Sequence, residues 1–337
     1  MTLLKKYRKY IIALLLVSVL LLIVKFISQI DFRILSTYLH KTPGMFLLVI
    51  LSSFIAYLLS SKGWMLCMGE EEKKISIKNV FVIRHIGEML GVFNPTGVIA
   101  GDTLKVSYLT KAGITKKNGF SSILLLRMLN VLSSLFLIVL SISYLAFGKF
   151  KGNNNLFLLL FILIVVALGF LLAKYLLDER LYLGKTVEKI SKKVKWSIFS
   201  KQTVDTCYEI NSISSEYFKT NKLKFTLAFL LITFHWIFGA LEFYIVLHSL
   251  HVDISIVDAT AIEMGVSLFK SIGAIIPGQI GIEEYGNKVM LNTIGVKSNE
   301  IWFVASLVRR SRQLFWLAVA AIFFMFFSKK KSFNPIS

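Results

Sequence analysis

The sequence predicts an all-α membrane protein that crosses the bilayer several times. Three observations support this fold class: 55% of the 337 residues are hydrophobic, only 17% are charged, and the apolar residues form very long runs. Soluble domains usually contain about 45–50% apolar and about 25% charged residues. The composition therefore excludes a soluble globular enzyme, a disordered chain and a disulfide-rich secreted fold.

Six apolar runs are long enough to be transmembrane helices. About 20 mostly apolar residues are needed to cross the hydrocarbon core as a helix. The runs cover residues 10–28, 44–68, 119–147, 155–177, 223–250 and 300–328. No small-residue cleavage site follows the first run, so we expect it to remain as an uncleaved anchor rather than to be removed as a signal peptide.

Lysine and arginine residues gather in the loops between these runs and give the chain a net charge of +20. Cytoplasmic loops of membrane proteins carry such an excess. With six crossings all strongly basic loops fall on one side, which predicts a multi-pass protein of the cell (cytoplasmic) membrane with both termini in the cytoplasm. This placement favours contact with anionic headgroups over nucleic acid. Cys67 and Cys207 lack metal-ligand spacing, so we expect free thiols and no metal or other cofactor.

Two further segments, residues 79–100 and 257–282, are apolar enough to enter the membrane but contain helix breakers. The first ends in Asn94-Pro95-Thr96-Gly97 and the second in Pro277-Gly278-Gln279-Ile280-Gly281. A full crossing by either would invert the side assigned to every later loop. We therefore predict two re-entrant or broken helices, which are tolerated at membrane depth where protein buries them or where they line a wet cavity.

The two broken segments also predict an internal repeat. An ungapped offset of 182 positions aligns 91–127 with 273–309 and gives six identities, where composition alone would give roughly two or three. The aligned pairs include Gly91 with Gly273, Pro95 with Pro277, Asp102 with Glu284, Gly113 with Gly295, and Arg127 with Arg309. The single membrane domain, 1–337, then consists of a first repeat, 10–147, and a second, 155–328. Three crossings separate the broken helices, so the repeats are predicted to be inverted, as in many transporters; the alternative is that Pro-Gly breaks are common in membrane helices.

Several charged residues fall near or inside the apolar segments, where a charge costs about 2.5–3.5 kcal/mol on insertion scales. They are Asp102, Arg127, Glu284, Arg309 and Arg310. Guanidinium groups and free N–H groups at helix breaks both favour phosphate. The carboxylates could hold the arginines when the site is empty, or bind a coupling proton or a cationic headgroup. We predict a polar midplane cavity with two acid–arginine sets related by a pseudo-two-fold axis; the alternative is that these charges form structural salt bridges.

Other polar residues have a local alternative. Glu88 and Lys270 belong to the candidate site, or they cap or snorkel at the ends of half-helices. Arg84 and His85 could contact headgroups or snorkel at the interface. His248 and His251 are three residues apart, but no carboxylate or cysteine set accompanies them, so no metal site is predicted.

The stretch 178–222 is predicted to be a cytoplasmic insertion in the second repeat. A helical stripe of apolar residues, Val187, Ile190, Val194 and Ile198, is flanked by lysines. This pattern is typical of an amphipathic helix on an anionic membrane surface; the alternative is a solvated connector that packs on the bundle. The insertion could also serve a homodimer or dock a partner enzyme.

The chain resembles the flippase-like membrane region of the lysylphosphatidylglycerol synthase family over about residues 10–328. One signature consists of Ile86-Gly87-Glu88, Pro95, Gly101-Asp102, Lys105, Gly113 and Arg127. The second is the Pro-Gly-rich turn from Pro277 to Glu284, followed by Arg309 or Arg310. The resemblance implies lipid translocation or work on lipid-linked glycans. The last span ends near Ser328, which leaves no room for the soluble aminoacyl-transferase domain of the synthases, so we do not expect lysyl transfer.

The leading functional hypothesis is a lipid translocase, not an enzyme, that acts on phospholipids or polyprenyl-phosphate-linked lipids. The alternatives are an intramembrane enzyme or accessory subunit of lipid-linked glycan synthesis or lipid modification, with Asp102 and Glu284 as catalytic carboxylates, and a non-transporting scaffold. The partners expected are membrane lipids that are anionic or carry phosphate. The candidate substrate-binding residues are Glu88, Asn94, Pro95, Gly101, Asp102, Lys105, Arg127, Lys270, Pro277, Gly278, Gly281, Glu283, Glu284, Arg309 and Arg310.

Overall fold

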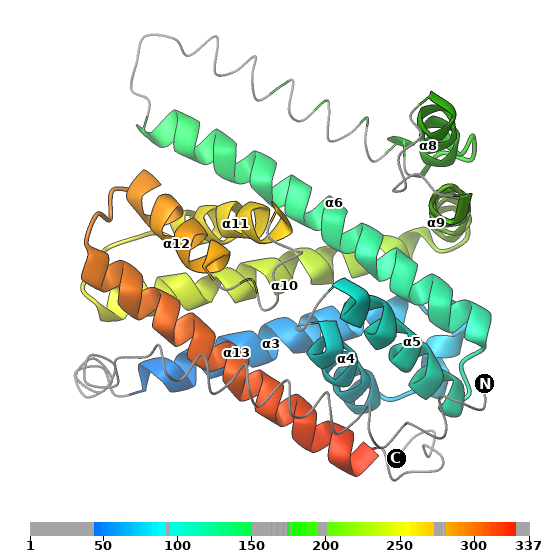
Figure 1. The fold of residues 1–337 in the computed structure, drawn as a ribbon, viewed down its shortest axis with the longest axis horizontal. Helices are drawn as coiled ribbons and strands as arrows, with labels where there is room; N and C mark the ends of the chain where they lie inside the picture. Colours follow the sequence, from blue (N-terminus) through cyan, green and yellow to red (C-terminus); the bar gives the residue numbers. More distant parts are fainter. Residues whose placement is uncertain are drawn as a thin grey trace.

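The computed structural model describes residues 44–91, 95–149, 177–193, 201–272 and 281–327, with positions 163, 167, 171, 174, 175 and 279 between them. Helices are the regular elements in these ranges (Figure 1). They are α3 (Met45–Leu66), the short 3₁₀ helix η1 (Gly69–Lys74), α4 (Ile77–Gly91), α5 (Pro95–Lys111), α6 (Lys116–Lys149), α8 (Tyr182–Lys193), α9 (Lys201–Thr220), α10 (Lys222–Ser249), α11 (Ile256–Ile272), α12 (Ile282–Thr293) and α13 (Asn299–Phe327). The predicted span 10–28 and most of the span 155–177 lie outside the described residues.

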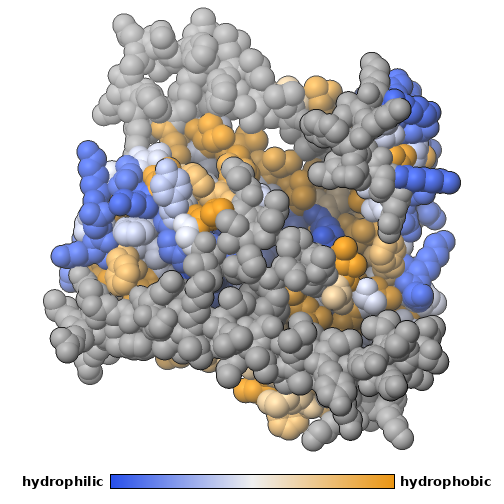
Figure 2. Space-filling model, viewed as in Figure 1, coloured by the Kyte–Doolittle hydropathy of each residue, from blue (hydrophilic) through white to orange (hydrophobic). Residues whose placement is uncertain are grey.

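Four of the described helices, α3, α6, α10 and α13, are long and apolar enough to cross a membrane. Each begins and ends close to a predicted span. Their outer surfaces carry exposed apolar side chains such as Leu47, Leu223 and Phe326. In Figure 2 hydrophilic residues lie mainly along two opposite margins, with hydrophobic residues between them, which is the surface expected of a protein that crosses a bilayer. The predicted all-α membrane fold is confirmed.

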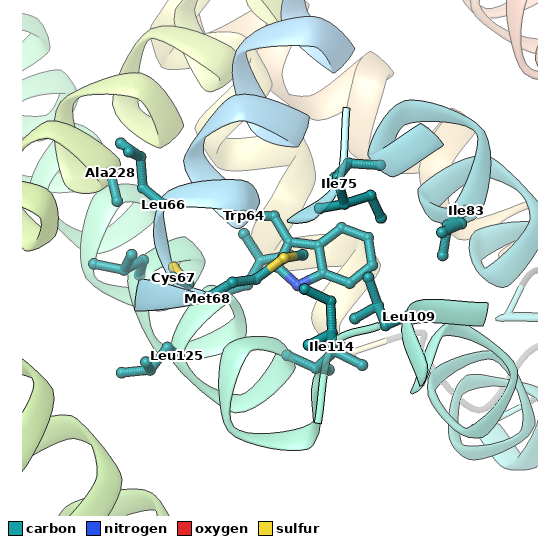
Figure 3. Close-up of a cluster of buried hydrophobic side chains, with 14 of the residues drawn as sticks. Trp64, Leu66, Cys67, Met68, Ile75, Ile83, Leu109, Ile114, Leu125 and Ala228 are labelled. Atoms are coloured by element: carbon teal, nitrogen blue, oxygen red, sulfur yellow. The ribbon is translucent and has the colours of Figure 1, made fainter. Parts of the chain in front are cut away.

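Helices α3 and α10 pack against each other in antiparallel directions at the centre of the bundle. Met45 at the start of α3 shares a core cluster with Leu247 at the end of α10. Trp64 at the end of α3 shares another with Ala228 near the start of α10. Figure 3 shows the indole of Trp64 in the middle of the second cluster, where its N–H donates to Ser122 Oγ at 3.1 Å. Apolar clusters therefore hold both ends of this helix pair together.

Each of the two broken segments folds back on itself as two short packed helices. In the second, Gly265 of α11 faces Met290 of α12, and Phe269 of α11 faces Gly286 of α12, so the two helices are antiparallel. In the first, Gly87 of α4 lies against Gly101 of α5. The predicted breaks are therefore present, and both separate helices that reverse direction.

The order of long helix, two short helices and long helix occurs twice, as α3–α6 and as α10–α13. The matching helices run in opposite directions (Figure 1). Helix α6 begins beside the start of α10, where Ile123 shares a cluster with Phe225. Helix α13 begins beside the end of α10, where Val304 shares a cluster with Leu247. Inverted repeats require this arrangement.

The closest approach in the first hairpin depends on Gly101. A Cβ atom at Gly101 would lie 2.2 Å from the carbonyl oxygen of Gly87, which is a backbone atom and cannot rotate away. Gly101→Ala is therefore expected to force α4 and α5 apart and to destabilise the fold by about 1–3 kcal/mol, measured as a lower melting temperature in detergent. Gly239→Ala in α10 is the matched control, because a Cβ there meets nothing within 4 Å. Equal melting temperatures for the two variants would contradict this packing.

The described part of the insertion packs on the helical bundle, where the hydroxyl of Tyr217 in α9 donates to the carbonyl oxygen of Leu66 at the end of α3. Gly184 of α8 lies against the ring of Tyr208 in α9, and Asn211 Oδ1 accepts the backbone N–H of Leu183 at 2.8 Å. Hydrogen bonds from Lys192 and Tyr208 hold the pKa of Glu188 below its ordinary value. Val194 and Ile198 lie outside the described residues, and the contact of this segment with a membrane surface or a partner stays a prediction.

Candidate functional site

A buried guanidinium group joins three helices in the second half of the chain. Arg309 of α13 is 2% exposed. Its nitrogen atoms lie 3.3 Å from Glu242 of α10, 2.7 Å from Glu263 of α11 and 3.3 Å from Glu283 of α12. Arg309 therefore fixes the positions of α10, α11 and α12 relative to α13.

The next residue, Arg310, extends this ionic network toward the second helix break. Its Nε donates to Glu284 Oε1 at 2.6 Å, and its Nη2 donates to the carbonyl oxygen of Gln279 at 3.2 Å. Glu284 Oε2 also accepts the N–H of Gly281 at 2.7 Å and so caps α12. Gly281 has a φ of 87°, a left-handed conformation that glycine adopts at no steric cost. Glu284 and Arg310 therefore hold the backbone of this turn in place through hydrogen bonds to Gly281 and Gln279.

Arg312 connects the network to α3. Its Nε donates to Glu242 at 2.9 Å and its Nη1 donates to the hydroxyl oxygen of Tyr57 at 2.7 Å. The complete set contains four carboxylates, Glu242, Glu263, Glu283 and Glu284, and three guanidinium groups, Arg309, Arg310 and Arg312. Lys270 also acts electrostatically on Glu283, which balances the charges. We call these eight residues the buried network.

The arginine of the first half is more accessible than its counterpart Arg309. Arg127 of α6 is paired with Asp102 of α5, and the Arg127 side chain is 49% exposed. Lys105 Nζ lies 3.5 Å from Asp102 and 5.9 Å from the centre of the Trp64 ring. Because Asp102 has a second cation within reach, Arg127 can exchange its partner without leaving an unpaired carboxylate. We call Asp102, Lys105 and Arg127 the open triad.

A third charged pair lies between the open triad and the buried network. Arg84 Nη2 of α4 is 3.1 Å from Glu88 Oε1, and the Glu88 side chain is 44% exposed. Lys105 is close enough to Glu88 to interact electrostatically. The Arg84 guanidinium lies 4.6 Å from the centre of the Tyr57 ring. Charged and polar groups therefore continue from Arg127 to Glu284 across both halves, with Tyr57 at the junction.

The structure brings most of the sequence-predicted site residues into these sets. Asp102, Lys105 and Arg127 form the open triad, while Lys270, Glu283, Glu284, Arg309 and Arg310 belong to the buried network. Pro95 begins α5. Gly101 allows the close approach of α4 and α5, and Gly281 provides the positive φ before α12. Asn94, Pro277 and Gly278 lie outside the described residues. Arg127 is far more exposed than Arg309. In the second set Glu284 binds Arg310, while Arg309 binds its neighbour Glu283.

The residues predicted for the site from the sequence do not include five residues of this region: Tyr57, Glu242, Glu263, Arg312 and Gln313. The amide nitrogen of Gln313 donates to Glu283 at 2.9 Å. A signal existed for Glu242, because it is the only acidic or basic residue, histidine aside, between residues 225 and 250, and a lone carboxylate in an apolar span needs a partner. Arg312 lies three residues after Arg309, on the same helix face. Arg84 and His85 were expected near the interface, but both are buried.

Comparison with known proteins is consistent with this architecture. The family described as the lysylphosphatidylglycerol synthase TM region matches residues 10–327. A UPF0104 membrane protein of Methanocaldococcus jannaschii is 23% identical over 257 residues, which are 74% of this chain and 74% of the relative. No solved structure matches the chain.

Proposed function

Because this chain belongs to the family of the lysylphosphatidylglycerol synthase TM region, we propose that it is a lipid translocase. Its substrate is a phospholipid or a polyprenyl-phosphate-linked lipid, which moves across the cytoplasmic membrane through a polar midplane cavity. A phosphate headgroup cannot enter hydrocarbon unaided, because burial of an unpaired charge is very costly. A translocase lowers this cost by offering the phosphate fixed partners inside the membrane.

The observation that best supports the proposal is the exposure of Arg127 within the open triad. A binding site for phosphate needs a cation that can leave its resting partner. Arg127 meets this requirement, because its side chain is half exposed and Asp102 can pair with Lys105 instead. Arg309 does not, because three carboxylates already surround it and it is 2% exposed.

The proposed binding step is an exchange of partners. A phosphate oxygen replaces Asp102 on Arg127, whose planar guanidinium can hold phosphate through two parallel hydrogen bonds. Lys105 keeps Asp102 neutralised, so the exchange creates no isolated charge. The hairpin break between Gly91 and Pro95 adjoins the triad through α5, and such interrupted helices form substrate sites in many transporters. The buried network holds the second half rigid against this movement.

Purified protein in liposomes is expected to move one lipid class between leaflets faster than protein-free liposomes do. Fluorescent phosphatidylglycerol, phosphatidylethanolamine and a short polyprenyl phosphate are compared, each with and without an ion gradient. The readout is the fraction of label that an impermeant quencher reaches over time. If protein that is folded and inserted moves none of the three, the proposal is wrong and an intramembrane enzyme or accessory subunit is favoured.

A further inference from the structure

Two adjacent residues of α4 each have a buried nitrogen atom without a hydrogen-bond partner. They are Arg84 Nη1 and His85 Nε2, and the two residues are 6% and 4% exposed. A buried polar atom left without a partner costs about 1–3 kcal/mol, so buried donors and acceptors are almost always satisfied. Neither nitrogen has a role in the pairs described above, where Arg84 uses Nη2 to contact Glu88.

The hydrogen bonds already present define what the two nitrogens require. His85 Nδ1 lies 2.7 Å from the carbonyl oxygen of Phe81. A carbonyl oxygen can only accept, so Nδ1 carries the hydrogen and Nε2 of the neutral ring presents a lone pair. Arg84 Nη1 can only donate. The missing ligand must therefore offer an acceptor oxygen to Arg84 and a hydrogen-bond donor to His85.

Both side chains lie against the same ring, in aromatic surroundings. The centre of the Tyr57 ring is 4.6 Å from the Arg84 guanidinium carbon and 5.1 Å from the centre of the His85 ring. Phe81, Trp316 and Phe323 also contact His85, with ring centres 4.2 Å, 5.1 Å and 6.3 Å away. Apolar walls exclude water and strengthen each hydrogen bond made there. The half-exposed Glu88 connects this region to the open triad through Lys105.

We infer that Arg84 and His85 form a headgroup site for a phospholipid that carries both a phosphate oxygen and a hydrogen-bond donor. A glycerol hydroxyl or an ethanolamine ammonium supplies the donor, and the quaternary ammonium of phosphocholine does not. Arg84 donates a hydrogen bond to the phosphate oxygen, and His85 Nε2 accepts one from the donor group of the headgroup. This inference rests on the proposed function and deepens it. It names the substrate class and adds a second binding site, selective for the headgroup, beside Arg127.

Headgroup selectivity can be measured as binding, without transport. Dihexanoyl phosphatidylglycerol, phosphatidylethanolamine and phosphatidylcholine are titrated into the detergent-solubilised protein, and the rise in melting temperature gives each affinity. We expect the first two lipids to bind about tenfold tighter than phosphatidylcholine, as one hydrogen bond in a dry site allows. His85→Phe should abolish this difference, and Arg84→Gln should weaken all three lipids by about tenfold.

The matched control is His235→Phe. His235 also lies near Tyr57, with ring centres 6.2 Å apart, and its Nδ1 also contacts a carbonyl oxygen, that of Ala56 at 2.9 Å. Unlike His85, it has no buried nitrogen among those left without a partner in the described residues. The control variant should therefore keep the wild-type preference.

Three results would overturn the inference. Equal binding of the three lipids by the wild type, or a preference that survives in His85→Phe, would assign the two nitrogens to an ordered water molecule. Stabilisation by inorganic phosphate but by none of the lipids would assign the site to free phosphate. The binding of the three lipids to the wild-type protein tests the inference even if a variant fails to fold. Headgroup selectivity without leaflet exchange in liposomes would instead overturn the translocase and leave this site in place.

Discussion

Arg309→Ala is expected to destabilise the folded protein by about 3–5 kcal/mol, the range for removal of one partner from a buried ion pair. The substitution leaves Glu242, Glu263 and Glu283 facing one another without the cation they share. Arg310 and Arg312 each retain contact with one of these carboxylates, but Glu263 keeps no guanidinium partner among the described residues. The loss should appear as a large fall in melting temperature in detergent and as a reduced yield of monodisperse protein.

Two further variants separate charge from geometry at this position. Arg309→Lys keeps the charge but loses the planar fork, so it should be intermediate in stability. The double variant Arg309→Met with Glu263→Gln removes one charge of each sign and should recover part of the loss, as coupled neighbours do. If Arg309→Ala melted within a degree or two of the wild type, the three short contacts would carry little energy and the assignment of Arg309 to the framework would be wrong.

Arg127→Ala, unlike Arg309→Ala, is expected to leave the stability nearly unchanged. It should reduce lipid movement between leaflets by about 10- to 100-fold. The Arg127 side chain is half exposed and pairs with one carboxylate, whereas Arg309 is buried among carboxylates of three helices, so the loss of Arg127 removes far less of the framework. In transport the same side chain is the proposed phosphate ligand, and hydrogen bonds to charged groups are worth about 1.5–3 kcal/mol.

Melting temperature and leaflet exchange are measured on the same preparations of this variant. Arg127→Lys should retain part of the exchange, because it keeps the charge without two parallel hydrogen bonds. Asp102→Asn should retain the fold and allow phosphate to bind without displacing a carboxylate. Full exchange by Arg127→Ala would contradict the role of the open triad, whereas a collapse in its stability would make Arg127 a framework residue like Arg309.

The helices were predictable from the sequence because their signals are local. A run of about 20 apolar residues can satisfy its backbone inside a bilayer only as a helix, and α3, α6, α10 and α13 begin and end close to the predicted spans. The breaks near Pro95 and Pro277 were equally visible, because proline lacks the N–H group that a helix interior requires. The membership of α8 and α9 in the packed bundle was less visible, since a polar amphipathic helix suits a membrane surface as well as a protein surface.

The partners within the site were only partly predictable. The 182-residue offset aligned Asp102 with Glu284 and Arg127 with Arg309, but it carried no information about which neighbour each arginine would choose. In the structure Arg309 binds carboxylates from three other helices, and only the packing of α10, α11 and α12 around α13 determines them. The difference in exposure between Arg127 and Arg309 likewise arises from neighbouring helices, not from the sequence near either arginine.

The sharing of Arg309 has a consequence for biosynthesis. Glu242, Glu263, Glu283 and Glu284 all precede Arg309, Arg310 and Arg312 in the chain, so the ribosome delivers four acidic side chains before any of the guanidinium groups that neutralise them. Helices α10, α11 and α12 must wait for α13 to arrive before their charges are balanced. The first half has a shorter delay, because Glu88 and Asp102 each have a cation one turn away in the same helix, Arg84 and Lys105 respectively. The buried network of the second half is therefore completed only when α13 enters the membrane.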